Sequence, residues 1–173
     1  MTRQFSQLVA WTCAGLILLQ VLLAVYACID IGAFARLSQR TLALPIQWIS
    51  VQTVQWYALL AITIALALPG VAALYFLRRP FTKFAQGEFF NDANSRDLRR
   101  FAVLLLVQAL LRPLHLALAS VVLSLNHPPG QKLLSLTVGS HELQAIGLAL
   151  VFWVLASLLL EGARLQSENR QFV

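Results

Sequence analysis

Four long apolar runs dominate the chain, and short polar segments separate them. The runs predict membrane spans at approximately 8–29, 54–77, 99–125 and 141–162. A helix of about 20 residues crosses a hydrocarbon core of about 30 Å, and each run approaches or exceeds that length. None of the runs has the polar face of a helix from a soluble bundle. Because a helix satisfies its own backbone hydrogen bonds in lipid, the pattern predicts an all-α, integral membrane four-helix bundle.

Composition supports this fold class and narrows it. Apolar residues make up 59% of the 173 residues and charged residues only 12%, whereas a soluble domain carries about 25% charged residues. These values exclude a disordered chain, a coiled coil and an ordinary soluble domain, and the length favours a single transmembrane domain over residues 1–173. The first run is longer than the core of a cleaved signal peptide, about 7–15 residues, so it is interpreted as a retained span. The ending at Cys28 resembles a lipoprotein signal, but the bulky Tyr26 argues against that alternative.

Charge predicts the orientation of the spans. The chain has 13 Lys and Arg against seven Asp and Glu, and its basic residues cluster between the runs. This distribution favours membrane lipids over nucleic acid as the partner, so no direct nucleic-acid binding is expected. Both termini are predicted to be cytoplasmic, in a bacterial plasma (inner) membrane. The cytoplasmic side then holds nine basic residues and the outer side three. The nine are Arg3, Arg78, Arg79, Lys83, Arg96, Arg99, Arg100, Arg164 and Arg170. The three are Arg36, Arg40 and Lys132.

Redox and metal chemistry receive little support from the sequence. Cys13 and Cys28 lie on one predicted helix, about 22 Å apart along its axis, whereas the Cα atoms of a disulfide lie within about 7 Å. Four-span thiol oxidases need cysteine pairs in their outer loops, and these loops have none. The three histidines show no paired spacing for a metal ion. We therefore expect no metal site, no cofactor and no catalytic residue set.

One ionisable face lies inside the third run. Gln108, Arg112 and His115 are spaced i, i+4 and i+7, which places them on one side of a helix. Arginine near the bilayer centre costs about 2.5–3.5 kcal/mol, so such a residue is a candidate for function. Pro113 frees a backbone carbonyl beside it, and Gln20 lies at a similar depth in the first run. The functional hypothesis is a pocket for an anionic head group, a quinone-like molecule or a signal ligand.

A purely structural role for Arg112 is the competing interpretation. Its side chain would reach toward the interface or bind freed carbonyls, while Gln and His side chains hold helices together. Counting along the runs assigns Asp30 and Glu142 to the outer interface and Glu161 to the inner one. Arg112 is therefore predicted to have no acidic partner at its own depth.

The segments between the runs predict smaller elements. Pro80 and Gly87 bracket a short inner-interface helix expected to lie along the lipid head groups. Asn94 or Ser95 is then expected to cap the helix of the third run. On the outer side, the loop at 31–51 and the alternation of Leu134, Leu136 and Val138 predict a small extracytoplasmic cap with a possible short strand pair.

The C-terminal segment carries a family resemblance. Charge spacing at Glu161, Arg164 and Glu168 predicts a helix that continues into the cytoplasm. The sequence "LLLEGARLQSENRQFV" resembles the end of an uncharacterised bacterial membrane family, domain of unknown function 2975. That family ends in a Gly-Ala-x-Leu-x-x-Glu-Asn/Asp pattern and has a Pro-Phe element with a Phe/Asn-rich inner loop. The matching residues here are Gly162, Ala163, Leu165, Glu168, Asn169 and Val173, with Pro80, Phe81, Phe84, Phe90 and Asn91 in the loop, whereas Arg170, Gln171 and Phe172 depart from the family's acidic tail.

Two function hypotheses follow. The resemblance implies a regulatory or sensory membrane protein, because members are often encoded beside a small helix-turn-helix regulator. The alternative is a carrier or membrane enzyme that binds a lipid, quinone or anionic ligand through the Gln20, Gln108, Arg112 and His115 side chains. An accessory or oligomeric role within a larger assembly is a further alternative. Under the first hypothesis the residues that dock the partner are Phe84, Phe89, Phe90, Arg164, Glu168 and Asn169.

Overall fold

The computed structural model describes residues 2–170 except 43, 45, 47, 87–91 and 129–131, and describes only the backbone at residues 2, 92 and 163–170. Across these residues the ordered elements are all helical, as the sequence predicts. Six helices follow one another along the chain: α1 (Thr2–Ile29), α2 (Ile31–Leu42), the short 3₁₀ helix η1 (Trp48–Ser50), α3 (Thr53–Gln86), α4 (Asp92–Ser124) and α5 (Ser140–Arg170).

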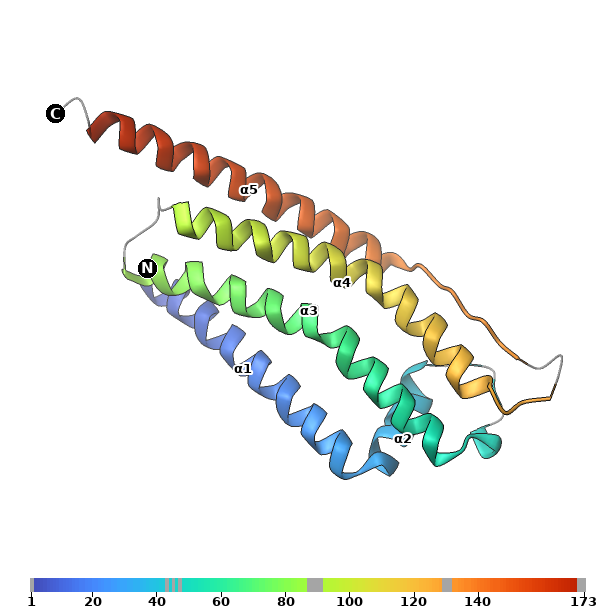
Figure 1. Ribbon diagram of the computed structural model, residues 1–173. Helices are drawn as coiled ribbons and strands as arrows, with labels where there is room; N and C mark the ends of the chain where they lie inside the picture. The colour runs from blue at the N-terminus through green and yellow to red at the C-terminus, as the bar shows by residue number, and fades with distance from the viewer. Residues whose placement is uncertain are drawn as a thin grey trace.

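The four long helices lie side by side in a row, in the order α1, α3, α4, α5 (Figure 1). Helix α3 packs against both α1 and α4, and α4 packs against α5. Each of the four contains an apolar stretch long enough to cross a bilayer, and at most 17% of any such stretch is buried within the protein. The exposed leucines and valines on these stretches need an apolar solvent. The chain is therefore a multi-pass membrane protein, and the predicted all-α membrane bundle is confirmed.

One end of the row carries most of the positive charge. Helix α1 begins there, α3 ends, α4 begins and α5 ends (Figure 1). We call this the basic end, because nine of the 13 Lys and Arg residues lie at or beyond it. The other end, which carries α2 and η1, is called the loop end.

The predicted inner-interface helix is wrong. Helix α3 does not stop at residue 77 and restart; it continues through Pro80 to Gln86. Proline removes one backbone hydrogen bond but need not end a helix whose other groups find partners. The Ser6 hydroxyl of α1 donates to the carbonyl of Phe81, and the Thr82 hydroxyl donates to the carbonyl of Arg79 at 2.7 Å. These hydrogen bonds join the end of α3 to α1 and to the preceding turn of α3.

The predicted start of the third span is also corrected. Helix α4 begins at Asp92, so Asn94 and Ser95 lie inside its first turn rather than at its cap. Both residues are buried. The helix extends outward through Ala93, Arg96 and Leu98, which are good helix formers, and the buried Asp97 is held there by Arg79 and Arg100.

The loop end holds a small apolar core. Leu44, Trp56, Leu59, Ala119 and Leu123 are buried together, with α2 residues packed against them. The segment at 31–51, predicted to be a loop, therefore contains an amphipathic helix.

Helix α4 and the segment that follows it lie against each other at this end. The segment 132–139 is extended, but it pairs with no strand among the residues described, so the predicted strand pair is not formed there. Instead, the Ser120 hydroxyl accepts from the Ser135 amide at 2.9 Å, and the Ser124 hydroxyl accepts from the Leu133 amide at 3.2 Å. The segment runs back along α4, and α5 therefore begins part-way along that helix (Figure 1).

Candidate functional site

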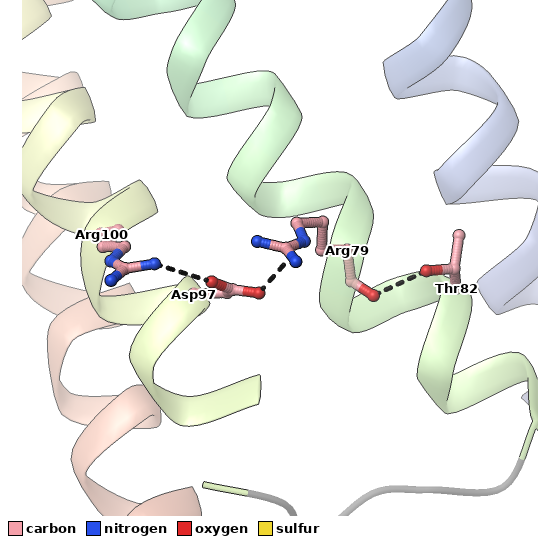
Figure 2. Close-up of polar contacts among 4 residues, drawn as sticks. All are labelled: Arg79, Thr82, Asp97 and Arg100. Carbon is pink, nitrogen blue, oxygen red and sulfur yellow. Dashed lines mark hydrogen bonds and ion pairs between the residues drawn. The ribbon is translucent and has the colours of Figure 1, made fainter. Parts of the chain in front are cut away.

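A buried carboxylate organises the basic end. Asp97 of α4 has a side chain only 6% exposed, and it lies between two guanidinium groups. Figure 2 shows Arg79 of α3 on one side, at 3.7 Å, and Arg100 of α4 on the other, at 3.4 Å. The arginine side chains are about half exposed, so their charges remain partly hydrated while Asp97 depends on them for its charge balance. The cluster joins α3 to α4.

Aromatic rings hold further arginines at the same end. The guanidinium of Arg100 lies 5.3 Å from the ring centre of Phe76 on α3. The neighbouring Arg99 lies 4.4 Å from the ring centre of Trp153 on α5. Cation–π contacts at exposed sites contribute about 0.5–1 kcal/mol each. Two successive arginines of α4 therefore contact the helices on its two sides, and α3, α4 and α5 are fixed relative to one another.

Phe101, the next residue of α4, packs between the same three helices. Its ring meets that of Phe152 edge to face, with centroids 4.8 Å apart. Phe101 is buried with Ala73, Leu98 and Ala156, which come from all three helices. The basic end is thus a packed, charge-linked layer. Sequence reasoning noticed its arginines but missed Asp97, whose partner Arg79 lies far away in the chain.

The arginine inside the third run has an acidic partner, contrary to the prediction. The Nε atom of Arg112 lies 3.2 Å from Oε1 of Glu142, the third residue of α5. The prediction failed because it assigned depth by counting along each run. Figure 1 shows that α5 begins part-way along α4 rather than at the outer end of the row. The ion pair with Glu142 therefore places the first turn of α5 beside Arg112.

Glu142 has a second role at the start of α5. Its Oε2 atom accepts a hydrogen bond from the Gly139 amide at 2.7 Å, which is half of a capping box. A carboxylate in the first turn also interacts favourably with the helix dipole. The Glu142 side chain is 9% exposed and that of Arg112 is 63% exposed. One carboxylate thus starts α5 and neutralises the cation of α4.

The other two members of the predicted face turn toward α3. The His115 Nε2 atom lies 2.9 Å from the Thr63 hydroxyl, which also contacts the carbonyl of Leu59. Gln108 lies against Gly70, where an added Cβ would meet the Gln108 amide oxygen at 3.4 Å. Both contacts bring α3 and α4 together. The three residues on α4 therefore divide between two neighbours, α3 and α5.

Gln20 does not join this group. It lies on α1, with an exposed side chain, and α1 packs against the far side of α3 (Figure 1). The four residues predicted to bind a ligand are consequently placed in three separate positions.

Cys13 is buried and Cys28 exposed, and no disulfide links them.

The residues predicted to dock a partner are placed only in part. Phe84 lies near the end of α3, where its ring meets Phe81 edge to face with centroids 5.7 Å apart. Phe89 and Phe90 fall outside the described residues. Helix α5 does continue into the tail as predicted, and it includes the backbone of Arg164, Glu168 and Asn169.

The loop end has a polar centre that sequence reasoning also missed. Gln55, which is buried, donates to the carbonyl of Val122 at 2.7 Å near the end of α4. Its amide oxygen accepts from the Gln52 amide at 2.7 Å and from Asn126 at 3.3 Å.

No group of three His, Cys, Asp or Glu suited to a metal ion occurs within the described part of the chain.

Comparison with known proteins places the chain in a family. No curated protein and no solved structure matches it. One family profile matches residues 12–172, which takes in most of α1 and all of α3, α4 and α5. The profile is described as Protein of unknown function (DUF2975), and the chain belongs to this family.

Proposed function

We propose that the chain is a regulatory membrane protein that faces the cytoplasm with its basic end and binds a helix-turn-helix regulator there. The positive-inside rule supports this orientation, because nine basic residues lie at or beyond that end. The membrane would then be the bacterial plasma membrane. The family resemblance implies that the partner is a helix-turn-helix regulator.

The observation that carries the proposal is the length of α5. The helix continues to Arg170, ten residues past Leu160, where the apolar run ends. It projects beyond the start of α4, so its last turns extend away from the row (Figure 1). A helix that leaves the membrane in this way offers a surface to a soluble protein.

The rest of the basic end supports a stable docking surface. Asp97 and the arginine–aromatic contacts fix α3, α4 and α5 relative to one another. A pre-organised surface loses less entropy when a partner binds. Phe84 adds an aromatic ring close to the same end. A signal that moved α5 against α4 would therefore change the surface presented to the regulator.

The alternative, ligand binding at the Arg112 face, receives less support from the geometry. An unpaired arginine would attract an anion, but Glu142 lies 3.2 Å away and balances its charge. Gln20 lies elsewhere, so the polar lining that the hypothesis needs is incomplete. The contacts of Gln108 and His115 with α3 are those of residues that join helices.

Co-purification of the full-length protein with a small helix-turn-helix regulator from the same cells tests the proposal. The key variant is Arg164→Ala with Glu168→Ala and Asn169→Ala. The matched control is Arg36→Ala with Arg40→Ala, on α2 at the loop end. We expect the wild type and the control to retain the regulator and the tail variant to retain at least tenfold less. No regulator with the wild type, or equal amounts with the tail variant, would overturn the proposal.

A further inference from the structure

A groove with mixed polar and apolar lining lies between α1 and α3 at the basic end. Its volume is about 240 Å³. Residues from each helix line it at helical spacing, so each set lies on one face. The lining consists of Gln7, Ala10 and Trp11 from α1, and of Arg78, Thr82, Ala85 and Gln86 from α3.

Arg78 differs from its neighbour Arg79 in having no counter-charge. Arg79 is paired with Asp97. No ion pair or hydrogen bond joins Arg78 to any other residue that the structure describes, and no carboxylate lines the groove. An uncompensated guanidinium beside a concave surface attracts an anion. Its planar donors match the oxygens of a phosphate or carboxylate.

The remaining polar groups of the groove complement Arg78. Gln7 and Gln86 carry amide donors, and neither forms a hydrogen bond with another described residue. The indole N–H of Trp11 is a further donor, and this side chain is 75% exposed. The Thr82 hydroxyl donates its hydrogen bond to the carbonyl of Arg79, so it is not available as a donor to a ligand. The groove therefore offers one cation and several neutral donors, a set suited to the several oxygens of a phosphate group.

Position and size favour a lipid head group. Arg78 directly follows the apolar run of α3, and Trp11 is an aromatic side chain of the type enriched at membrane interfaces. The volume is several times that of one water, about 30 Å³, but below the roughly 300–1,000 Å³ of pockets that enclose a whole small-molecule ligand. A phosphate head group would fit while its acyl chains remain in the bilayer beside α1, where Leu16, Leu18 and Leu19 are exposed.

We propose that this groove binds the phosphate-bearing head group of an anionic phospholipid through Arg78, Gln7 and Gln86. The proposal goes beyond the function proposed above, from which it takes only the cytoplasmic orientation of the basic end. Basic pockets between membrane helices on that side are suited to anionic head groups. The groove lies on α1 and α3, whereas the projecting helix that binds the regulator is α5.

Native mass spectrometry of the full-length protein in mild detergent tests this site. The protein is titrated with phosphatidylglycerol, with phosphatidylcholine and with free glycerol 3-phosphate. We expect one tightly held phosphatidylglycerol, with binding at least tenfold weaker for the other two. Equal binding of phosphatidylcholine would overturn the requirement for an anion. Equal binding of glycerol 3-phosphate would overturn the assignment to a lipid.

Matched variants locate the site. Arg78→Gln is expected to weaken phosphatidylglycerol binding at least tenfold. The control Arg96→Gln removes the same charge from an exposed position at the same end but outside the groove, and should leave binding within twofold of wild type. Ala85→Leu keeps the charge and fills the groove, so it provides a second test if Arg78→Gln purifies poorly. Equal loss with Arg96→Gln, or no loss with Ala85→Leu, would contradict the proposal.

Discussion

Arg112 in the middle of α4 and Glu142 in the first turn of α5 lie 3.2 Å apart, although 29 residues separate them in the chain. The pair joins two adjacent helices of the row, and the carboxylate also caps the helix to which it belongs. The position of α5 along α4 is therefore linked to the charge balance of an arginine within an apolar run.

A double-mutant cycle at this pair is expected to be strongly non-additive. Arg112→Leu leaves the buried carboxylate without its cation, and Glu142→Gln leaves the cation without its carboxylate, so each single change should destabilise the protein. The variant with both changes should be more stable than the sum of the two losses predicts. The measurement is the free energy of unfolding in mild detergent. Additive losses would show that the two side chains do not interact.

Glu142→Ala should lower the stability of the protein more than Glu142→Gln does. The glutamine retains an oxygen that accepts from the Gly139 amide, whereas alanine removes both the charge and the cap. Loss of a helix cap costs about 1 kcal/mol. Thermal unfolding of the two variants in the same detergent makes the comparison. Equal stability would indicate that the hydrogen bond to Gly139 contributes nothing.

The Asp97 cluster should respond asymmetrically to loss of its charges. Asp97→Asn leaves two arginines that are about half exposed and can be hydrated, so the expected cost is about 1 kcal/mol. Arg79→Gln with Arg100→Gln strands the buried carboxylate, and the expected cost is about 3 kcal/mol. Either arginine change alone should cost less than about 1 kcal/mol, since the other cation remains. Equal losses for Asp97→Asn and the double arginine variant would contradict this account.

A substitution at Thr63 measures the hydrogen bond to His115. Thr63→Val keeps the shape of the side chain and removes the hydroxyl, so we expect a loss of about 0.6 kcal/mol, typical of hydrogen bonds between membrane helices. In a His115→Leu background the same change should have almost no effect. An equal loss in both backgrounds would assign the effect to the carbonyl of Leu59 instead of His115.

Gln55 offers a matching test at the loop end. Gln55→Leu removes hydrogen bonds to Val122, Gln52 and Asn126 while retaining much of the volume. Buried polar groups then lose their partners, and the expected cost is about 2 kcal/mol. Hydrogen exchange should rise in the last turn of α4. A variant as stable as wild type would show that water replaces the lost contacts.

The spans were predictable because hydropathy alone determines them. The first was predicted to end at residue 29, and α1 ends at Ile29. At the basic end the helices extend past the predicted limits of the spans, partly because arginine, lysine and glutamine are good helix formers. At the loop end α4 stops at Ser124, one residue before its predicted limit. Hydropathy reports where lipid lies and not where a helix ends. The extension of α3 through Pro80 and the start of α4 at Asp92 were missed for this reason.

The helix α2 carried a signal that was overlooked. Ile31, Phe34, Ala35 and Ser38 are spaced i, i+3, i+4 and i+7, the pattern of an amphipathic helix. Three of these residues pack against the core at the loop end.

The sequence predicted polar residues for the candidate site, but it did not predict which residues they contact. The spacing of Arg112 and His115 placed them on one polar face of a helix, but their partners Glu142 and Thr63 depend on how far each helix is shifted along its neighbour. That offset is set by the extended segment 132–139, which Ser120 and Ser124 hold against α4. Nothing in the spacing of residues along one helix encodes it.

Cysteine labelling in intact cells tests the central claim, that four spans place the basic end in the cytoplasm. Arg96→Cys and Lys132→Cys are introduced separately into a background carrying Cys13→Ala and Cys28→Ala. Both positions have exposed side chains, and they lie toward opposite ends of the row. With a membrane-impermeant maleimide, Lys132→Cys should be labelled in intact cells and Arg96→Cys only after permeabilisation. Labelling of both residues, or of Arg96→Cys alone, in intact cells would contradict the account.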